Sequence, residues 1–272
     1  MKQYVIIITL ISTLLGGSSC KEWLKVDSED RIMEDALFQS ESGFFTALNG
    51  VYVHLLNTNL YGRTLTAGTF DILAQYYDTT KPLNSHTYRS LANFELQAKK
   101  DAVADTWKEA YFLIANINTI LEHCENDRSV LSESNYELIK GECLALRAML
   151  HFEMFRIFGP IYSYEPGKVC IPYSDDTEKN VKPLLSAIDV VDKILTDLNQ
   201  AENLLLNVDP VITKGPQSSA EGNNRLRYRN LRLNYFAVQA LTAPEIRQKP
   251  GDMHGKSFPE HLNFSRSQPV NK

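Results

Sequence analysis

The stretch GECLALRAMLHFEMFRIFG, residues 141–159, decides the fold of this chain. Its apolar side chains recur at intervals of three and four residues, which is the period of one face of an α-helix. A capping box lies upstream, because Ser134 is followed three residues later by Glu137. A Gly-Pro pair at 159–160 ends the pattern, since glycine frees the backbone and proline removes a hydrogen-bond donor. The sequence therefore predicts a long helix over 134–159.

Similar periodic patterns predict helices on both sides of this stretch. In one of them Thr106 and Glu109 have the capping-box spacing, and in another Pro183 suits the first helical position. The further helices that we expect are 40–57, 106–124, 183–205 and 225–241.

Residues 58–100 carry no clean period and mix glycine, threonine, asparagine and tyrosine, which is typical of an ordered but irregular segment. The four helices that follow form two antiparallel pairs, with loops near 125–133 and 207–224. A pair of amphipathic helices is too thin to bury its own apolar face, so such pairs stack in helical repeat proteins. We therefore predict an all-α fold of irregular tetratricopeptide-like helical repeats with an irregular inserted segment.

The amino terminus has the three parts of a secretory signal, which are Lys2, an apolar run over 5–15 and small residues. The run is too short to cross a bilayer, which takes about 20 residues. It ends in GGSSCKEW, 16–23, where small residues precede Cys20 as in a bacterial lipobox. We expect a signal peptide over 1–19 and attachment of acyl chains, such as palmitate, to Cys20 as a lipid anchor. An ordinary signal peptide with an incidental cysteine is the alternative.

The chain of 272 residues has a net charge of −5 at pH 7, with 43% hydrophobic and 22% charged residues. This composition is typical of a globular protein with one large domain or two small ones. Because nucleic-acid binding proteins usually carry a basic stripe, the acidic balance argues against a nucleic-acid partner. Cys124, Cys143 and Cys170 form no C-x-x-C pair, so we expect buried free thiols, with one disulfide as the alternative.

Five segments, in order, resemble the SusD/RagB family of nutrient-binding outer-membrane lipoproteins. They are FFTALNGVYVHLL (44–56), TWKEAYFLIANINTILEHC (106–124), GECLALRAMLHFEMFRIFG (141–159), ILTDLNQAENLL (194–205) and RLNYFAVQAL (232–241). The lipobox adds to the likeness. The resemblance implies a lipid-anchored protein of the outer membrane that faces the cell exterior. It also implies non-catalytic capture of a glycan or other nutrient and delivery to a SusC-type TonB-dependent transporter.

The resemblance ends near residue 242. Prolines break the pattern beyond Leu241, so we expect a family-like helical domain over 20–242 and a disordered, non-family tail over 243–272. Relatives run on for a region about as long as this chain. We hypothesise a reading-frame change or premature end near Thr242, with a naturally short member as the alternative. A truncated helical docking remnant without ligand binding is therefore our second functional hypothesis.

Enzymatic signatures are scarce in this sequence. It contains no H-E-x-x-H motif, no Cys/His cluster, no G-x-S-x-G elbow and no phosphate loop. We therefore expect no enzyme, no metal and no cofactor. A pair of carboxylates that meets only in the fold stays open as the alternative.

The segment FDILAQYYDTTKPLNSHTYRS, 70–90, is the candidate ligand site. Glycan binding usually needs aromatic rings for sugar faces and planar polar groups for hydroxyls, and both occur in this irregular stretch. The resemblance implies that part of the ligand site comes from the corresponding stretch of the family. Packing in a half-buried position is the alternative role for its tyrosines. The tentative ligand-binding residues are Asp71, Gln75, Tyr76, Tyr77, Asp78, His86 and Tyr88.

Three charged residues of the long helix resemble an active-site set, namely Glu142, Arg147 and Arg156. Their neighbours are core-type residues, so we predict instead that the two arginines cap or bridge helices. Trp107 lies on an apolar stripe and is expected to pack in the core.

Overall fold

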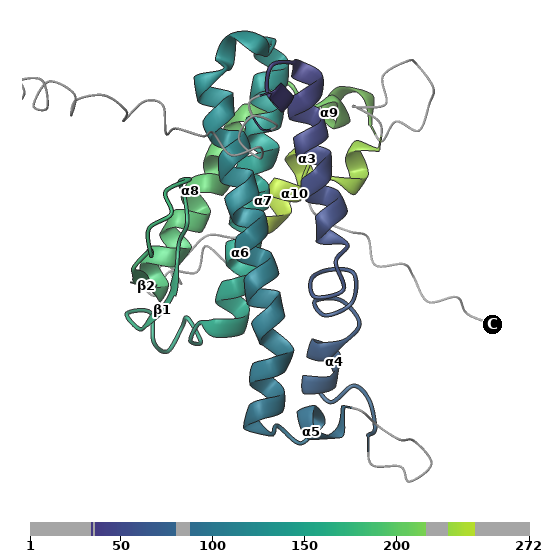
Figure 1. Ribbon diagram of the computed structural model, residues 1–272, viewed down its shortest axis with the longest axis vertical. Coiled ribbons are helices and arrows are strands. Elements are labelled where there is room, and N and C mark those ends of the chain that lie inside the picture. Colours follow the sequence, from purple (N-terminus) through teal and green to yellow (C-terminus); the bar gives the residue numbers. More distant parts are fainter. Residues whose placement is uncertain (1–33, 35, 80–87, 216–227, 243–272) are drawn as a thin grey trace, which may run out of the picture.

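The computed structural model describes residue 34 and residues 36–79, 88–215 and 228–242 (Figure 1). Its helices are α3 (Glu41–Leu55), α4 (Thr69–Leu73), α5 (Arg89–Ala92), α6 (Leu96–Asn126), α7 (Glu133–Phe158), α8 (Ala187–Leu205), α9 (Pro210–Lys214) and α10 (Tyr235–Leu241). Two short 3-10 helices, η1 (Arg128–Val130) and η3 (Arg229–Leu231), and two strands, β1 (Val169–Pro172) and β2 (Leu184–Ser186), complete it. The strands pair antiparallel in a two-stranded sheet. The predicted all-α class is confirmed.

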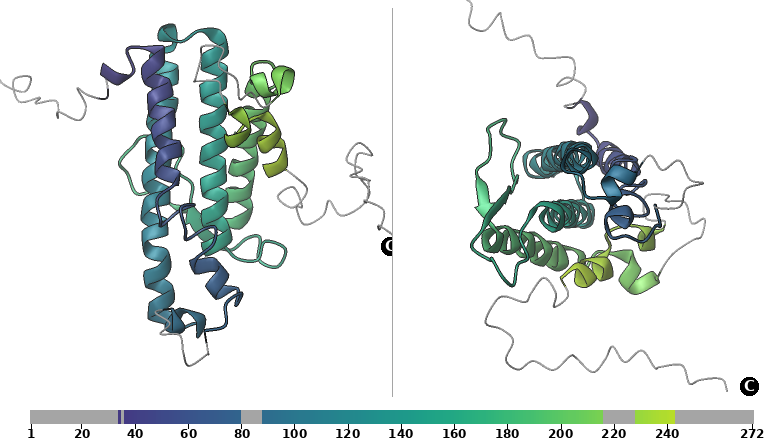
Figure 2. Two further views of the ribbon diagram at one scale, coloured as in Figure 1. Left: turned by 90° about the vertical axis from the view of Figure 1, so that its right-hand side faces the viewer. Right: turned by 90° about the horizontal axis from the view of Figure 1, so that it is seen from below.

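Helix α7 lies in the centre of the bundle, where it contacts α3, α6, α8 and β1. The end-on view of Figure 2 shows α6, α7 and α8 as neighbouring rods, with α3 beside α6 and α10 beside α8. Buried residues occur on every side of α7, as expected for a helix enclosed by others. Figure 1 shows α6 running past the other long helices to reach α5 at the lower end.

Close packing of α7 on α8 depends on Gly141. A Cβ atom at this position would lie 2.8 Å from Cγ of Leu205, a side chain that is itself fully buried. Leu205 belongs to α8, so the missing side chain lets the two helices approach each other at this point. The position falls within the stretch that the sequence predicts as a long helix.

Two predicted helix starts are wrong. Helix α6 begins at Leu96, and Thr106 lies inside it, where its hydroxyl donates to the Asn59 carbonyl at 2.9 Å. Helix α7 begins at Glu133 after Ser132, so Ser134 is a residue of the first turn and not the cap. In both cases the capping-box spacing is present in the sequence, but the hydroxyl does not cap the helix.

The predicted third and fourth helices are shorter than expected. Residues 184–186 form β2, and α8 begins only at Ala187, where Ser186 Oγ accepts from the Asp189 N–H at 3.3 Å. The last helix, α10, begins at Tyr235 because Asn234 Oδ1 accepts from the Ala237 N–H at 2.9 Å.

Several expectations fall outside the described residues, namely the signal peptide, the Cys20 anchor and the tail over 243–272. Cys124, Cys143 and Cys170 are all free thiols, as predicted, and Cys170 is only half-buried. Burial raises the pKa of Cys124 to about 12. Among the residues that the structure describes, no helix has both the length and the apolar character needed to cross a membrane.

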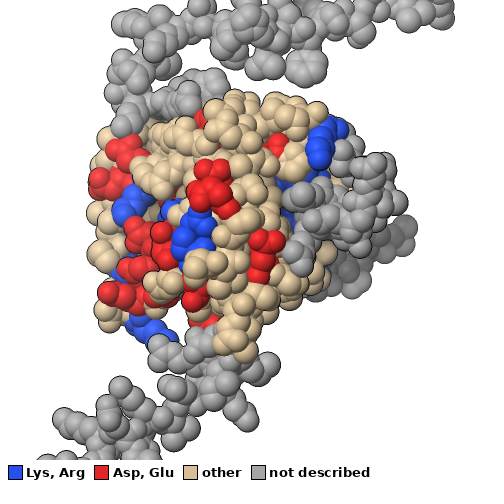
Figure 3. Space-filling view, turned by 90° about the horizontal axis from the view of Figure 1, so that it is seen from above, with Lys and Arg blue, Asp and Glu red and all other residues tan. Residues whose placement is uncertain are grey.

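Figure 3 shows the end of the bundle that points up in Figure 1, where acidic and basic side chains lie next to one another. Ion pairs follow the turn between α6 and α7, including Arg128 with Glu133 and Lys140 with Glu125, the latter at 2.7 Å. On this face the two signs of charge are mixed, and neither forms a continuous stripe among the described residues.

Candidate ligand-binding site

Helices α4 and α5 lie against each other and near the start of α6, at the lower end of Figure 1. They bury a small apolar cluster of Ile72, Leu91 and Ala92, with Leu73 and Ala98 packed against it. This cluster is separate from the main core of the bundle. The candidate stretch therefore forms a distinct tip that is attached to a long helix.

Both short helices end in the same unusual way. After α4, the Tyr76 N–H donates to the Asp71 carbonyl at 3.0 Å, and Gln75 adopts φ 62°. After α5, the Glu95 N–H donates to the Ser90 carbonyl at 2.9 Å, and Phe94 adopts φ 59°. These are the six-residue closures of Schellman motifs, in which glycine usually takes the left-handed position. A side chain there costs about 1–2 kcal/mol.

The left-handed Gln75 joins the two short helices. Its Nε2 donates to the Ile72 carbonyl at 3.3 Å and to the Ala92 carbonyl at 2.9 Å. The bond to Ala92 holds the end of α4 beside the end of α5. Residues 75–78 and 88–94 therefore lie close together, although the sequence separates them.

The exposed faces of this tip are rich in aromatic rings. Tyr76 is 79% exposed, Tyr77 is 52% exposed and Tyr88 is 45% exposed. Phe94 is also half exposed, at 50%. Large rings left open to solvent on a rigid turn are suited to stacking against a flat apolar surface.

The structure brings together most of the predicted ligand-binding residues. Asp71 is half-buried, Gln75 forms the link between helices, and Asp78 is exposed beside the tyrosines. His86 lies outside the described residues. Sequence reasoning missed Phe94, which lies between α5 and α6 and carries no pattern that marks it as exposed.

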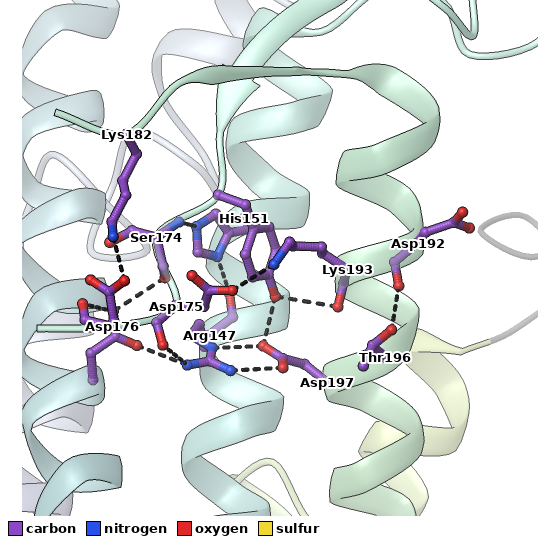
Figure 4. Close-up of polar contacts among 12 residues, drawn as sticks. Arg147, His151, Ser174, Asp175, Asp176, Lys182, Asp192, Lys193, Thr196 and Asp197 are labelled. Carbon is purple, nitrogen blue, oxygen red and sulfur yellow. Dashed lines mark hydrogen bonds and ion pairs between the residues drawn. The ribbon is translucent and has the colours of Figure 1, made fainter. Parts of the chain in front are cut away.

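A second polar group of residues, between α7 and α8, is drawn in Figure 4. Arg147 donates twice to the Asp197 carboxylate, from Nε at 2.7 Å and from Nη2 at 2.8 Å. Its Nη1 donates to Asn118 at 3.0 Å, and the Tyr173 hydroxyl donates to Asp197 at 2.6 Å. Arg147 therefore bridges α7 and α8, as the sequence predicted.

His151 completes this group. Its Nδ1 donates to the Arg147 carbonyl at 2.9 Å, and its Nε2 accepts from the Ser174 N–H at 3.0 Å, which assigns the neutral tautomer. Burial lowers the pKa of His151 to about 3, and burial together with the Asp197 carboxylate raises the pKa of Tyr173 well above its ordinary value. These groups keep one protonation state near neutral pH, and their hydrogen bonds join α7 to α8 and to the segment after β1.

The other two charged residues of the long helix differ in role. Arg156 pairs with Glu153 of the same helix at 3.1 Å, so the prediction that it bridges or caps helices is wrong. Glu142 is buried and accepts from Arg229 at 2.8 Å and from Arg232 at 2.9 Å, which ties the last described segment to α7.

Trp107 is half-buried and packs against the main core, as predicted from its apolar stripe. Its ring is tilted to that of Tyr111 and edge-on to that of Phe158, with centroids 4.6 and 4.8 Å away. Among the residues described, no group of three or more His, Cys, Asp and Glu side chains could hold a metal ion.

Paired helices around a buried central helix define a helical-repeat protein with a separate tip. A family model of SusD-like proteins, described as "Starch-binding associating with outer membrane", matches residues 22–221. The chain belongs to this SusD-like family, and the resemblance seen in the sequence is confirmed.

Two curated relatives come from Formosa agariphila. SusD-like protein P25 is 25% identical over 225 residues, which cover 78% of this chain and 40% of the relative. SusD-like protein P38 is 27% identical over 210 residues, which cover 75% of this chain and 39% of the relative. The chain thus spans about two fifths of the length of these relatives.

Solved structures share the fold. A SusD-like carbohydrate binding protein from Bacteroides vulgatus has a TM-score of 0.57 at 20% identity, covering 77% of this chain and 42% of that one. A SusD homolog from Bacteroides thetaiotaomicron has a TM-score of 0.58 at 19% identity, covering 79% of this chain and 37% of that one. At these identities the likeness establishes the fold alone.

Proposed function

We propose that this chain captures a glycan at the outer face of the outer membrane, without catalysis, and passes it to a SusC-type TonB-dependent transporter. The family description supports glycan binding and association with the outer membrane. Acylated Cys20 would hold the chain to the membrane, since two or more acyl chains give stable anchoring. The transporter partner is an expectation from the family resemblance.

The observation that carries this proposal is the exposed aromatic tip. Tyr76 and Tyr77 follow the left-handed Gln75 directly, so the hydrogen bonds of that turn fix the backbone that presents both rings. Asp71 and Asp78 lie near these rings along the chain, and carboxylates are the kind of acceptor that sugar hydroxyls use. Stacking and charge-assisted hydrogen bonds together are the usual means of holding a sugar ring.

Affinity electrophoresis tests this proposal. The full chain is run through native gels that contain starch, pullulan, laminarin, xylan, pectin or alginate. We expect retardation by at least one of these polysaccharides and its loss in the double variant Tyr76→Ala/Tyr77→Ala. The matched control is Tyr164→Ala, because Tyr164 is 81% exposed but lies in the connection between α7 and β1.

Unretarded migration of the wild type in every gel contradicts glycan capture. That result favours the second hypothesis, a helical docking remnant without a ligand, which then requires co-purification with the transporter. Equal retardation of the wild type and the double variant keeps glycan capture but removes the tip as its site.

A further inference from the structure

A groove of about 480 Å³ runs between α3 and α6, away from the aromatic tip. Its walls are mainly apolar side chains of the two helices, and polar residues stand at its rim. At one end His54 of α3 and Phe112 of α6 line it, and at the other end Glu34 does. None of the residues of the aromatic tip lines this groove.

The lining of the groove includes Gly50, an exposed residue in the interior of α3. Glycine costs a helix about 1 kcal/mol relative to alanine, so a helical glycine usually makes room for a close neighbour. A Cβ atom at Gly50, however, would meet nothing within 4 Å, in contrast to Gly141. The glycine thus leaves open space in the groove that no described part of the chain fills.

One end of the groove has the side chains of a saccharide subsite. Phe112 is 54% exposed, and its ring centroid lies 5.1 Å from that of His54. His54 Nε2 donates to Glu109 Oε2 at 2.6 Å, which fixes the orientation of the His54 ring. Asn116 Nδ2 donates to the Phe112 carbonyl at 2.8 Å, so this amide is also held in place. An open ring is therefore flanked by the oriented side chains of His54 and Asn116.

We propose that this groove is a second saccharide subsite, in which Phe112 stacks on the apolar face of a pyranose ring. His54 and Asn116 then bind its hydroxyls, and Glu109 holds the His54 ring in place. The inference rests on the proposed function, because it assumes that the chain binds a glycan. A docked apolar helix fits less well, since it would bury the polar rim without giving those groups new hydrogen bonds.

Figure 1 shows α3, α4 and α5 following one another along α6, so the groove and the aromatic tip lie at different heights along that helix. Phe112 is 16 residues from the first residue of α6, Leu96, which corresponds to about 24 Å along the axis. One long glycan chain can contact both sites, whereas a short oligosaccharide contacts only one. Binding at two linked sites raises the affinity for the long chain well above that of either site.

Two variants of the full chain test the inference on a polysaccharide that retards the wild type. Gly50→Leu fills the open space with a good helix former, and Phe112→Ala removes the stacking ring. Both should weaken binding of the polysaccharide by about tenfold or more through loss of avidity. Binding of short oligosaccharides at the tip should persist in both variants and be lost in Tyr76→Ala/Tyr77→Ala.

Matched controls are available elsewhere in the chain. A Cβ atom at Gly167 would also meet nothing within 4 Å, so Gly167→Leu adds the same side chain outside the groove. Phe236, which is 52% exposed on α10, is the counterpart of Phe112. Gly167→Leu and Phe236→Ala should bind the polysaccharide as the wild type does. Circular dichroism of all four variants checks that each one is folded.

Hydrogen exchange adds a direct measurement. The polysaccharide should slow exchange over 47–54 and 109–119 in the wild type, and this protection should vanish in Gly50→Leu. Wild-type affinity in both groove variants overturns the second subsite but leaves glycan capture intact. Absence of retardation by every polysaccharide overturns both proposals. A third outcome concerns the chain without glycan. If amides over 47–54 and 109–119 then exchange faster in Gly50→Leu than in the wild type, another part of the chain fills the groove, and the second subsite is overturned.

Discussion

Of the three described residues other than glycine that have a positive φ angle, two lie at the candidate ligand site, and the third is Tyr228. Gln75 and Phe94 both hold positive φ angles at helix ends where glycine is the usual residue. Such positions cluster at functional sites when the surrounding structure determines them. Here the strain places an amide where it links two helices and a ring where solvent reaches it.

A comparison of two variants measures the strain at Gln75. Both Gln75→Ala and Gln75→Gly lose the hydrogen bond to Ala92, but only glycine relaxes the left-handed backbone. Urea unfolding should therefore find Gln75→Gly more stable than Gln75→Ala by about 1 kcal/mol. The opposite order would show that this turn changes its backbone conformation when the amide is lost.

Acid should destabilise the fold through His151. Its pKa is about 3 in the folded chain against 6.5 for the free side chain, so the unfolded state binds more protons between these values. The stability is complete above pH 6.5 and falls as the pH decreases toward 3. Between pH 7 and pH 5 the loss is about 2 kcal/mol.

The variant His151→Gln checks this pH dependence, because its neutral amide keeps a donor and an acceptor. The difference in unfolding free energy between wild type and variant should shrink by about 2 kcal/mol as the pH decreases from 7 to 5. A difference that is independent of pH would mean that the pKa of His151 is the same in the folded and the unfolded chain.

Helix packing gives opposite expectations for two glycines. Gly141→Ala should destabilise the chain by about 1–3 kcal/mol, since the new methyl group overlaps the buried Leu205. Gly50→Ala should stabilise it by up to about 1 kcal/mol, since its methyl group meets open space. Thermal and urea unfolding of both variants provide the measurement, and a shift of the same sign in both is incompatible with the packing described.

The double variant Gly141→Ala/Leu205→Ala controls for the cause of the first effect. Removing the Leu205 side chain makes room for the new methyl group, so adding Gly141→Ala should cost less in this background. If Gly141→Ala lowers the unfolding free energy equally with and without Leu205→Ala, overlap with the Leu205 side chain is not the cause.

The helices could be predicted from the sequence because their apolar faces have the period of 3.6 residues. Their ends could not, since capping depends on which hydroxyl meets which backbone group. Thr106 has the spacing of a cap but bonds instead to Asn59, which is distant in sequence. The strands β1 and β2 are too short to show an alternating pattern, so the sequence predicts a helix directly after Pro183 where β2 lies.

The sequence locates the candidate site only as a stretch. Aromatic and polar residue types mark 70–90, but which of them are exposed depends on the turns after α4 and α5. Neither turn has the glycine that would reveal it in the sequence. Phe94 and the groove at Gly50 required the fold, because both depend on segments that come together only in space.

The described chain has two separate apolar clusters, and we expect the parts that they hold together to differ in local stability. The main cluster joins α3, α6, α7, α8 and β1 in one contiguous core, whereas the tip depends on Ile72, Leu91 and Ala92. Local opening requires less free energy where fewer apolar groups are buried. Native-state hydrogen exchange should therefore show amides of 70–78 and 88–94 exchanging at a lower opening free energy than those of α7.

Two core variants separate these units. Ile72→Ala should speed amide exchange in the tip alone. Ile114→Ala, in the main core, should lower the opening free energy of amides in α6 and α7 by about 2–5 kcal/mol. Loss of protection throughout the chain in Ile72→Ala would show that the tip and the bundle unfold as one unit.

The separate tip has a consequence for the natural history of this protein. Its rings stand on a small apolar cluster of their own, so we expect new side chains at 75–78 and 88–94 to leave the bundle intact. Side chains at the tip can therefore vary widely, while the residues of α7 and its neighbours are constrained by packing. We expect homologous proteins to differ most in sequence between α4 and α6. Their ligand specificity can then change at the tip while the helical bundle stays the same.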